Sequence, residues 1–195
     1  MYPFVETIRI EDGVPHNLYY HQLRMERTMR KFFPHASVPS LKEKLNKTAW
    51  PSDTIMKVHV EYSGQGITLV KAVEYHIRRI RKLRLVTCDD IDYAFKSVDR
   101  SRLEQLVQQN GDADEIIIVK NGLLTDTSYS NIALYDGTEW LTPKIPLLKG
   151  TMRQSLLDRG VIVERDITSS DYLSYKKVSL INAMMPLGRC ECNIP

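Results

Sequence analysis

Cysteine is scarce in this sequence, which contains only Cys88, Cys190 and Cys192. An odd number of cysteines cannot all pair, and Cys190 and Cys192 are separated by a single residue close to the C-terminus. No second cysteine pair stands elsewhere in the chain to complete a zinc site. We therefore expect reduced thiols and no metal centre.

Long apolar runs and a strong net charge are also missing. No stretch approaches the ~20 apolar residues that a membrane-spanning helix needs, and the first residues show no basic-then-apolar leader. Lys and Arg number 27 against 24 Asp and Glu, and the resulting formal charge of +3 does not by itself indicate nucleic acid as a partner. We expect a cytoplasmic protein that binds neither membranes nor nucleic acid.

What the sequence does contain is typical of a folded chain. Hydrophobic residues make up 43% and charged residues 26% of the 195, which disfavours disorder and coiled coil. This length suits one large domain or two small ones.

The first half has the pattern of a small α+β domain. Residues 4–10 alternate as in a strand, residues 11–13 supply a hairpin turn, and an apolar stripe predicts a helix from an N-cap at Asn17 to Pro34. A short helix over 40–48 and a hairpin with strands 54–61 and 67–76 follow.

The second half alternates short strands and helices. Strands are predicted over 83–88, 115–120, 123–124, 130–135, 140–142, 161–165 and 177–183, and helices over 101–109 and 150–158. We expect a small N-terminal α+β domain over residues 1–82 and a larger C-terminal α/β domain over residues 83–195. The basic run at residues 77–84 marks the transition and is typical of a solvated strand or linker, with phosphate or nucleic-acid binding as the less favoured interpretation.

Three stretches contain residue types that carry chemistry. Lys96 follows Asp92-Tyr93-Ala94-Phe95, an apolar and aromatic setting that favours a neutral, nucleophilic amine, although a solvated surface lysine is the ordinary alternative. Asp126 lies in a hydroxyl-rich bend between two apolar strands. Gly150 opens a helix whose first amides can bind an anion, as the start of any helix can.

In this order and spacing, these stretches resemble the class IV (fold type IV) pyridoxal-phosphate enzymes, which include branched-chain and D-amino acid aminotransferases and aminodeoxychorismate lyase. The resemblance begins with Phe4-Val5-Glu6-Thr7-Ile8-Arg9 and continues through His21-Gln22-Leu23-Arg24-Met25. It includes Gly150-Thr151-Met152-Arg153 and ends with Asn182-Ala183-Met184-Met185-Pro186, so it spans nearly the whole chain. It implies a two-domain enzyme with pyridoxal 5'-phosphate as cofactor and a small-molecule amino substrate, assembled as a homodimer.

The resemblance also assigns roles. It makes Lys96 the catalytic lysine that forms the Schiff base with the cofactor, and places that lysine in the C-terminal domain. It makes Arg24 the arginine that holds the cofactor phosphate, and Asp126 the acid that meets the pyridine nitrogen, where the family commonly has glutamate. The remaining cofactor-binding residues that it implies are Ser130, Asn131, Gly150, Thr151, Met152, Asn182 and Ala183.

Within the family, two blocks favour a lyase. Met152 and the Asn182-Ala183-Met184-Met185-Pro186 loop are similar to the lyase pattern, so the resemblance is greatest to aminodeoxychorismate lyase, in an N-terminally shortened form. The expected reaction converts 4-amino-4-deoxychorismate to 4-aminobenzoate and pyruvate, a step of folate biosynthesis. A class IV aminotransferase and a cofactor-binding relative without lyase activity remain the alternatives.

Overall fold

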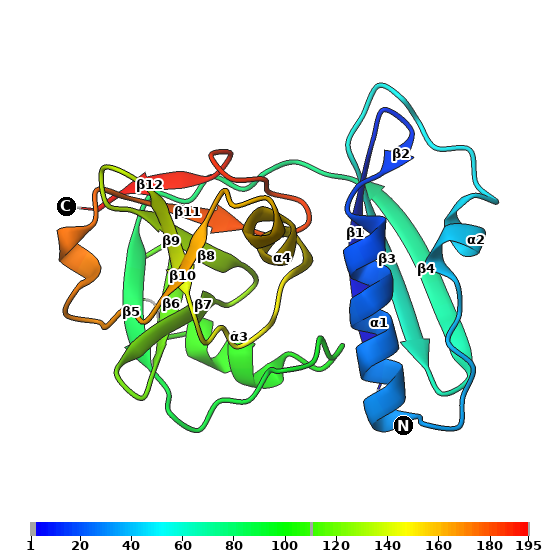
Figure 1. Ribbon diagram of the computed structural model, residues 1–195, viewed down its shortest axis with the longest axis horizontal. Coiled ribbons are helices and arrows are strands. Elements are labelled where there is room, and N and C mark those ends of the chain that lie inside the picture. The colour runs from blue at the N-terminus through cyan, green and yellow to red at the C-terminus, as the bar shows by residue number, and fades with distance from the viewer. Residues whose placement is uncertain (1–2, 110, 195) are drawn as a thin grey trace. The chain divides into compact units, whose positions relative to one another are not determined.

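The computed structural model describes residues 3–109 and 111–194, and the contacts among its Cα atoms divide the chain into two compact units (Figure 1). The first unit comprises residues 1–76 and 95–99, and the second comprises residues 77–94 and 100–195. The chain therefore returns briefly to the first unit after it has entered the second.

The first unit is a four-stranded antiparallel sheet with two helices, as its pattern predicts. The sheet order is β2-β1-β3-β4. The elements are β1 (Phe4–Glu11), β2 (Val14–Pro15), β3 (Met56–Ser63), β4 (Gly66–Glu74), α1 (Leu18–Phe32) and α2 (Leu41–Leu45).

Tight local geometry joins β1, β2 and α1. The two-residue turn Asp12-Gly13 has positive φ at both positions, as a type I′ hairpin requires. Asn17 lies at the N-cap of α1 as expected, but it adopts the left-handed conformation and makes no side-chain capping bond. No helix among the described residues is long and apolar enough to cross a membrane.

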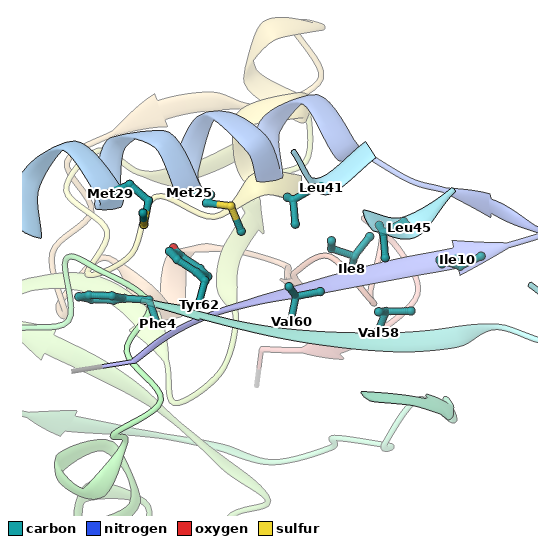
Figure 2. Packing of buried hydrophobic residues seen from close by; sticks show 10 residues of the cluster. All are labelled: Phe4, Ile8, Ile10, Met25, Met29, Leu41, Leu45, Val58, Val60 and Tyr62. Carbon is teal, nitrogen blue, oxygen red and sulfur yellow. The ribbon is translucent and has the colours of Figure 1, made fainter. Parts of the chain in front are cut away.

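The core of the first unit lies between its helices and one face of its sheet. Figure 2 shows Met25 and Met29 on α1 pointing down toward the side chains of β1 and β3. Ile8 from β1 and Val60 from β3 are fully buried in this cluster. The alternating pattern of β1 thus places its apolar side chains beneath α1.

The second unit is built on a larger mixed sheet in the order β10-β9-β8-β7-β6-β5, with β11 pairing with both β8 and β12. The β5–β6 and β9–β10 pairs are parallel, and the other pairs are antiparallel. The strands are β5 (Leu83–Thr87), β6 (Glu115–Lys120), β7 (Leu123–Thr127), β8 (Asn131–Tyr135), β9 (Trp140–Pro143), β10 (Val163–Arg165), β11 (Lys177–Ile181) and β12 (Glu191–Asn193). The helices are α3 (Ser101–Val107), α4 (Thr151–Asp158) and the short 3₁₀ helix Tyr172–Ser174.

Two apolar clusters anchor the long helices of the second unit. Leu103 and Leu106 of α3 pack with Ile116 and Ile118 of β6. Met152 and Leu156 of α4 pack with Ala133 of β8 and Ile181 of β11. The start of α4, which the sequence analysis identifies as a possible anion site, is therefore packed against the central strands β8 and β11.

The segment Phe95–Asp99 joins the first unit because it pairs with β1. The amide of Val5 donates to the Lys96 carbonyl at 2.9 Å, and the amide of Val98 donates to the Pro3 carbonyl at 3.1 Å. The Phe95 ring stacks edge-on against Phe32 of α1. Lys96 is thus grouped with the first unit, whereas the sequence places it in a domain that begins at residue 83, and the connecting residues 77–82 belong to the second unit.

Candidate active site

In the first unit, a buried ion cluster surrounds Arg24. Its Nε and Nη2 atoms donate to the two carboxylate oxygens of Glu6 at 2.9 and 2.5 Å. The Nδ1 atom of His21 lies 2.6 Å from Oε2 of the same carboxylate. Glu6 and His21 are completely buried, and the Arg24 side chain is 8% exposed. Strand β1 and helix α1 thus fix Arg24 through its two-point contact with Glu6.

The protonation states of this cluster follow from burial and charge. Burial acts to raise the pKa of Glu6, but the Arg24 charge and the hydrogen bonds from His21 and Arg24 overcome it and lower that pKa to about 2. Burial lowers the pKa of His21, and the charges of Arg24 and Lys96 lower it further against the opposing effect of Glu6. The cluster is therefore a carboxylate paired with a guanidinium beside a neutral imidazole.

Lys96 lies at the edge of the first sheet on segment Phe95–Asp99. Its main chain is held by Val5, and its side chain is half-buried. The Lys96 charge acts on His21, so lysine and arginine both belong to the surroundings of this imidazole. The adjacent Phe95 ring receives the Arg27 guanidinium 5.3 Å from its centroid. Two of the predicted site residues, Arg24 and Lys96, are thus brought together around His21.

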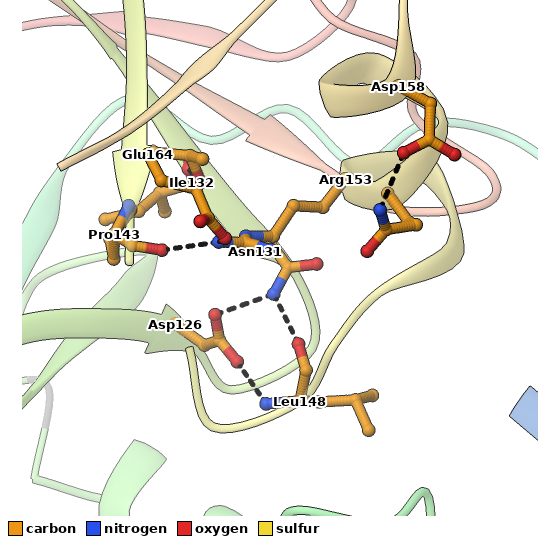
Figure 3. Close-up of polar contacts among 10 residues, drawn as sticks. Asp126, Asn131, Ile132, Pro143, Leu148, Arg153, Asp158 and Glu164 are labelled. Carbon is orange, nitrogen blue, oxygen red and sulfur yellow. Dashed lines mark hydrogen bonds and ion pairs between the residues drawn. The ribbon is translucent and has the colours of Figure 1, made fainter. Parts of the chain in front are cut away.

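In the second unit, Asp126 is the central acidic group. It lies on β7 and is 5% exposed. Figure 3 shows its Oδ1 accepting from Asn131 Nδ2 at 2.7 Å and its Oδ2 accepting from the Leu148 amide at 2.8 Å. Burial raises the pKa of Asp126 to about 7, although these two hydrogen bonds and the charge of Arg153 oppose the rise. Asp126 is therefore a buried carboxyl that exchanges a proton near neutral pH.

Asn131 links Asp126 to the start of α4. Besides bonding Asp126, its Nδ2 donates to the Leu148 carbonyl at 2.8 Å. Gly150 is the N-cap of α4, and a Cβ at this position would collide with the Oδ1 atom of Asn131. Only glycine allows the helix start to come this close, so the predicted residues Asn131 and Gly150 lie side by side.

Ser130 and the first residues of α4 support the site from within the fold. The Ser130 hydroxyl bonds the Thr127 hydroxyl at 2.8 Å and closes the bend between β7 and β8. Thr151 and Met152 are buried, and Met152 belongs to the apolar cluster beneath α4. The side chain of Met152 therefore helps to seat the helix.

The loop after β11 contacts the same bend. Asn182 Oδ1 accepts from the amides of Met184 and Met185 at 2.8 and 3.0 Å. Its Nδ2 donates to the Tyr129 carbonyl at 3.3 Å. Ala183 lies within this turn and is half-buried. Among the predicted residues of the second unit, Asp126 thus contacts Asn131 and Asn131 lies against Gly150, while Asn182 reaches the same bend through the Tyr129 carbonyl.

Sequence reasoning missed several residues that hold the site. Glu6 and His21 appear in the sequence only as parts of motifs, yet they hold Arg24. The signal that could have identified Glu6 is a carboxylate on the same face of β1 as the apolar residues Phe4 and Ile8. Leu148 contributes only main-chain atoms to Asp126 and Asn131, so no side-chain pattern could have revealed it.

The fold and these two groups of residues define a class of protein. The family model for class IV aminotransferases matches residues 4–191, and the chain belongs to that family. It is therefore an enzyme, a pyridoxal-phosphate-dependent lyase or aminotransferase, and the predicted fold type IV architecture is confirmed.

Three known proteins that are similar to this chain are matched over nearly their whole length. An uncharacterized protein of Haemophilus influenzae (strain ATCC 51907 / DSM 11121 / KW20 / Rd) is 37% identical, with 94% of this chain and 98% of that protein covered. A crystal structure from Haemophilus somnus 129PT, described as a candidate 4-amino-4-deoxychorismate lyase, is 33% identical with a TM-score of 0.91, covering 96% of this chain and 98% of that one. A candidate amino-acid aminotransferase from Mesorhizobium loti, at 17% identity and a TM-score of 0.79, covers 99% of both chains and shows the shared fold.

Proposed function

We propose that this protein is a pyridoxal-phosphate-dependent lyase that converts 4-amino-4-deoxychorismate to 4-aminobenzoate and pyruvate, a step of folate biosynthesis. The observation that carries the proposal is the lyase-type pair of Met152, at the start of α4, and the Asn182–Pro186 loop. Met152 packs against Ala133 of β8, and Asn182 bonds Tyr129 in the bend between β7 and β8. The Haemophilus somnus structure, whose description names the same reaction, supports it.

The side chains fit this cofactor chemically. A phosphorylated pyridine with an aldehyde needs a cation and amides for the phosphate, an amine for the aldehyde and an acid for the ring nitrogen. Arg24 supplies the cation, and the helix start at Gly150 carries no side-chain cap. Lys96 supplies the amine, and Asp126 is a buried acid whose pKa is raised to about 7.

The residues would divide the work as follows. Bound pyridoxal phosphate supplies an electron sink for the carbon that loses a proton. Arg24, the amides of Thr151 and Met152, and the Asn182–Ala183 turn would hold the phosphate. Asp126 would keep a proton at the ring nitrogen, with Ser130 and Asn131 fixing the strand that presents it.

Lys96 would attach the cofactor and then act as the mobile base. As a free amine it would take the proton beside the substrate nitrogen, after which the enolpyruvyl group leaves as pyruvate. Aromatisation of the remaining ring to 4-aminobenzoate makes the elimination favourable. In an aminotransferase the same lysine would deliver the proton to a carbon of the cofactor. The presence of the lysine therefore does not distinguish the two reactions.

The products test the proposal directly. Purified protein supplied with pyridoxal phosphate and 4-amino-4-deoxychorismate should release pyruvate and 4-aminobenzoate in equal amounts, measured by a coupled pyruvate assay and by chromatography. Glutamate or alanine with 2-oxo acids should give little amino exchange. Rapid exchange without pyruvate release would assign the chain to the aminotransferases instead.

Replacing Asp126 by asparagine should reduce turnover by about 100-fold or more while cofactor still binds, because a neutral amide no longer holds the ring-nitrogen proton but the phosphate contacts remain. Cofactor binding is measured by its absorbance on titration. Unchanged turnover would show that Asp126 does not face the ring nitrogen. Asp158→Asn, at an exposed position at the end of α4, is the matched control for the same acid-to-amide exchange and should turn over like the wild type.

The same substitution should change the pH dependence of stability in cofactor-free protein. Because burial raises the folded pKa of Asp126 from 3.8 to about 7, the acid stabilises the fold while protonated, and this contribution is lost as the pH rises toward and through 7. As the pH is raised from 5 to 8, the melting temperature should therefore fall more steeply for the wild type than for Asp126→Asn.

We also propose that the chain forms a homodimer. Several large apolar side chains of the first unit are exposed, among them Tyr19 at 67%, Val73 at 56% and Phe32 at 44%. Such surfaces are commonly covered by a partner. Sedimentation equilibrium should give twice the chain mass, and a fully active monomer would refute the proposal.

A further inference from the structure

A hollow of about 560 Å³ opens in the second unit between two stretches of chain, residues 77–81 and 189–193. The stretches run side by side where the connector to β5 passes β12 (Figure 1). The Cys192 thiol donates to the Ile80 carbonyl at 3.2 Å, and the Cys190 sulfur lies 3.9 Å from the Arg78 carbonyl. These contacts hold the walls in place, and the volume falls within the usual range for small-molecule sites.

The hollow combines an apolar floor with a cationic rim. Ile80, Cys190 and Cys192 are between 3% and 5% exposed. Four exposed arginines line the rim: Arg78, Arg79, Arg81 and Arg189. The one carboxylate in the lining belongs to Glu191, which lies 3.4 Å from the Lys177 amine.

Nearby acids balance the charges of the rim arginines only in part. Among the residues that the structure describes, none of the four forms a salt bridge. Arg78 donates to the Asp114 carbonyl, and the Asp114 carboxylate accepts from the main chain of Arg81 and Lys82. These main-chain hydrogen bonds, and then the charges of Arg78 and Arg81, lower the pKa of Asp114, so one acid faces these two arginines. The hollow therefore keeps an excess of positive charge.

We propose that this arginine hollow binds a small organic anion that carries two or more phosphate or carboxylate groups. Guanidinium groups on opposite walls match several oxyanions at once, each through paired N–H donors. The apolar floor accommodates a carbon skeleton that bare phosphate lacks. None of the residues proposed to hold the cofactor lines the hollow, so the site is additional to the lyase reaction.

Calorimetric titration of the protein saturated with pyridoxal phosphate tests the proposal, with citrate and pyrophosphate as probes. The cofactor occupies the proposed phosphate site during the measurement. We expect saturable one-to-one binding that weakens as salt is raised. Arg79→Gln/Arg189→Gln, which removes one charge from each wall, should weaken binding at least 10-fold, and Arg79→Lys/Arg189→Lys should weaken it less.

The matched control is Lys42→Gln/Lys44→Gln, which removes the same charge from exposed positions on α2 of the first unit. It should bind both probes like the wild type. Lack of saturable binding by the wild type, or equal weakening in the control, would overturn the proposal. The proposal would also be overturned if a single-stranded oligonucleotide or phosphatidylserine vesicles bound more tightly than citrate and pyrophosphate and the arginine variant abolished that binding. The surface would then bind a macromolecule or a membrane. Circular dichroism checks folding, and if the double glutamine variant does not fold, Arg79→Gln alone should still weaken binding.

Discussion

Lys96→Ala should lower turnover by at least about 1,000-fold, because it removes both the amine that attaches the cofactor and the base that moves the proton. The fold should persist, since the Val5 amide bonds the Lys96 carbonyl and the Val98 amide bonds the Pro3 carbonyl, and alanine at position 96 keeps both bonds. Circular dichroism and thermal melting check the fold, and the coupled pyruvate assay measures turnover.

Borohydride reduction adds a measurement that does not depend on turnover. Reduction of the wild type with bound cofactor, followed by peptide mapping, should label Lys96 and no other residue, and Lys96→Ala should remain unlabelled. Lys71→Ala, at an exposed position on β4 of the same unit, is the matched control and should label and turn over like the wild type. A label on a different lysine would rule out the assignment.

Of the proposed variants, Glu6→Gln should lower the free energy of unfolding most, by about 3 kcal/mol, because it leaves the buried Arg24 guanidinium without its counter-charge. Urea denaturation measures the loss. Glu26→Gln removes an acid from the same unit whose contact with Arg30 at 3.4 Å is largely exposed, and it should cost less than about 1 kcal/mol. Equal losses in the two variants would show that the buried cluster has no special role.

The pH dependence of this difference has a definite sign. The folded pKa of Glu6, about 2, lies below its ordinary value of 4.5, so its contribution is present above pH 4.5 and is lost as the pH falls toward 2. The stabilities of wild type and Glu6→Gln should therefore converge as the pH falls below 4.5. In the wild type, His21, whose pKa is also lowered by burial, is charged less readily in the folded state and adds to the loss of stability in acid.

Local patterns were sufficient to predict most of the elements. The alternation in β1, the stripe of α1 and the turn at Asp12-Gly13 each depend on neighbouring residues, and each element forms where expected. The second helix spans Leu41–Leu45 and is shorter than the predicted 40–48, because Asn46 caps it with its amide bonded to the Lys42 carbonyl at 3.0 Å. Such boundaries depend on the last turn of a helix, where sequence signals are weakest.

The arrangement of the candidate site residues depends on contacts between residues far apart in the sequence, and local sequence patterns do not predict such contacts. Ordered motifs identified Asp126, Asn131 and Gly150, and the structure places these three beside one another. The pairing of Glu6 with Arg24 spans 18 residues and depends on how α1 lies over β1. The return of Phe95 to the first unit is likewise a tertiary pairing, without a signature in its own residues.

That return has a consequence for biosynthesis. The chain crosses between its units three times, after residues 76, 94 and 99, so no single cut separates them. On the ribosome, residues 1–76 emerge before the segment that supplies the Val5 and Pro3 partners. The edge of β1 therefore stays unpaired during translation of about twenty further residues, at ~5–20 residues per second for at least a second. Fragments ending before residue 95 should consequently aggregate through this edge, and separate expression of the two units should fail.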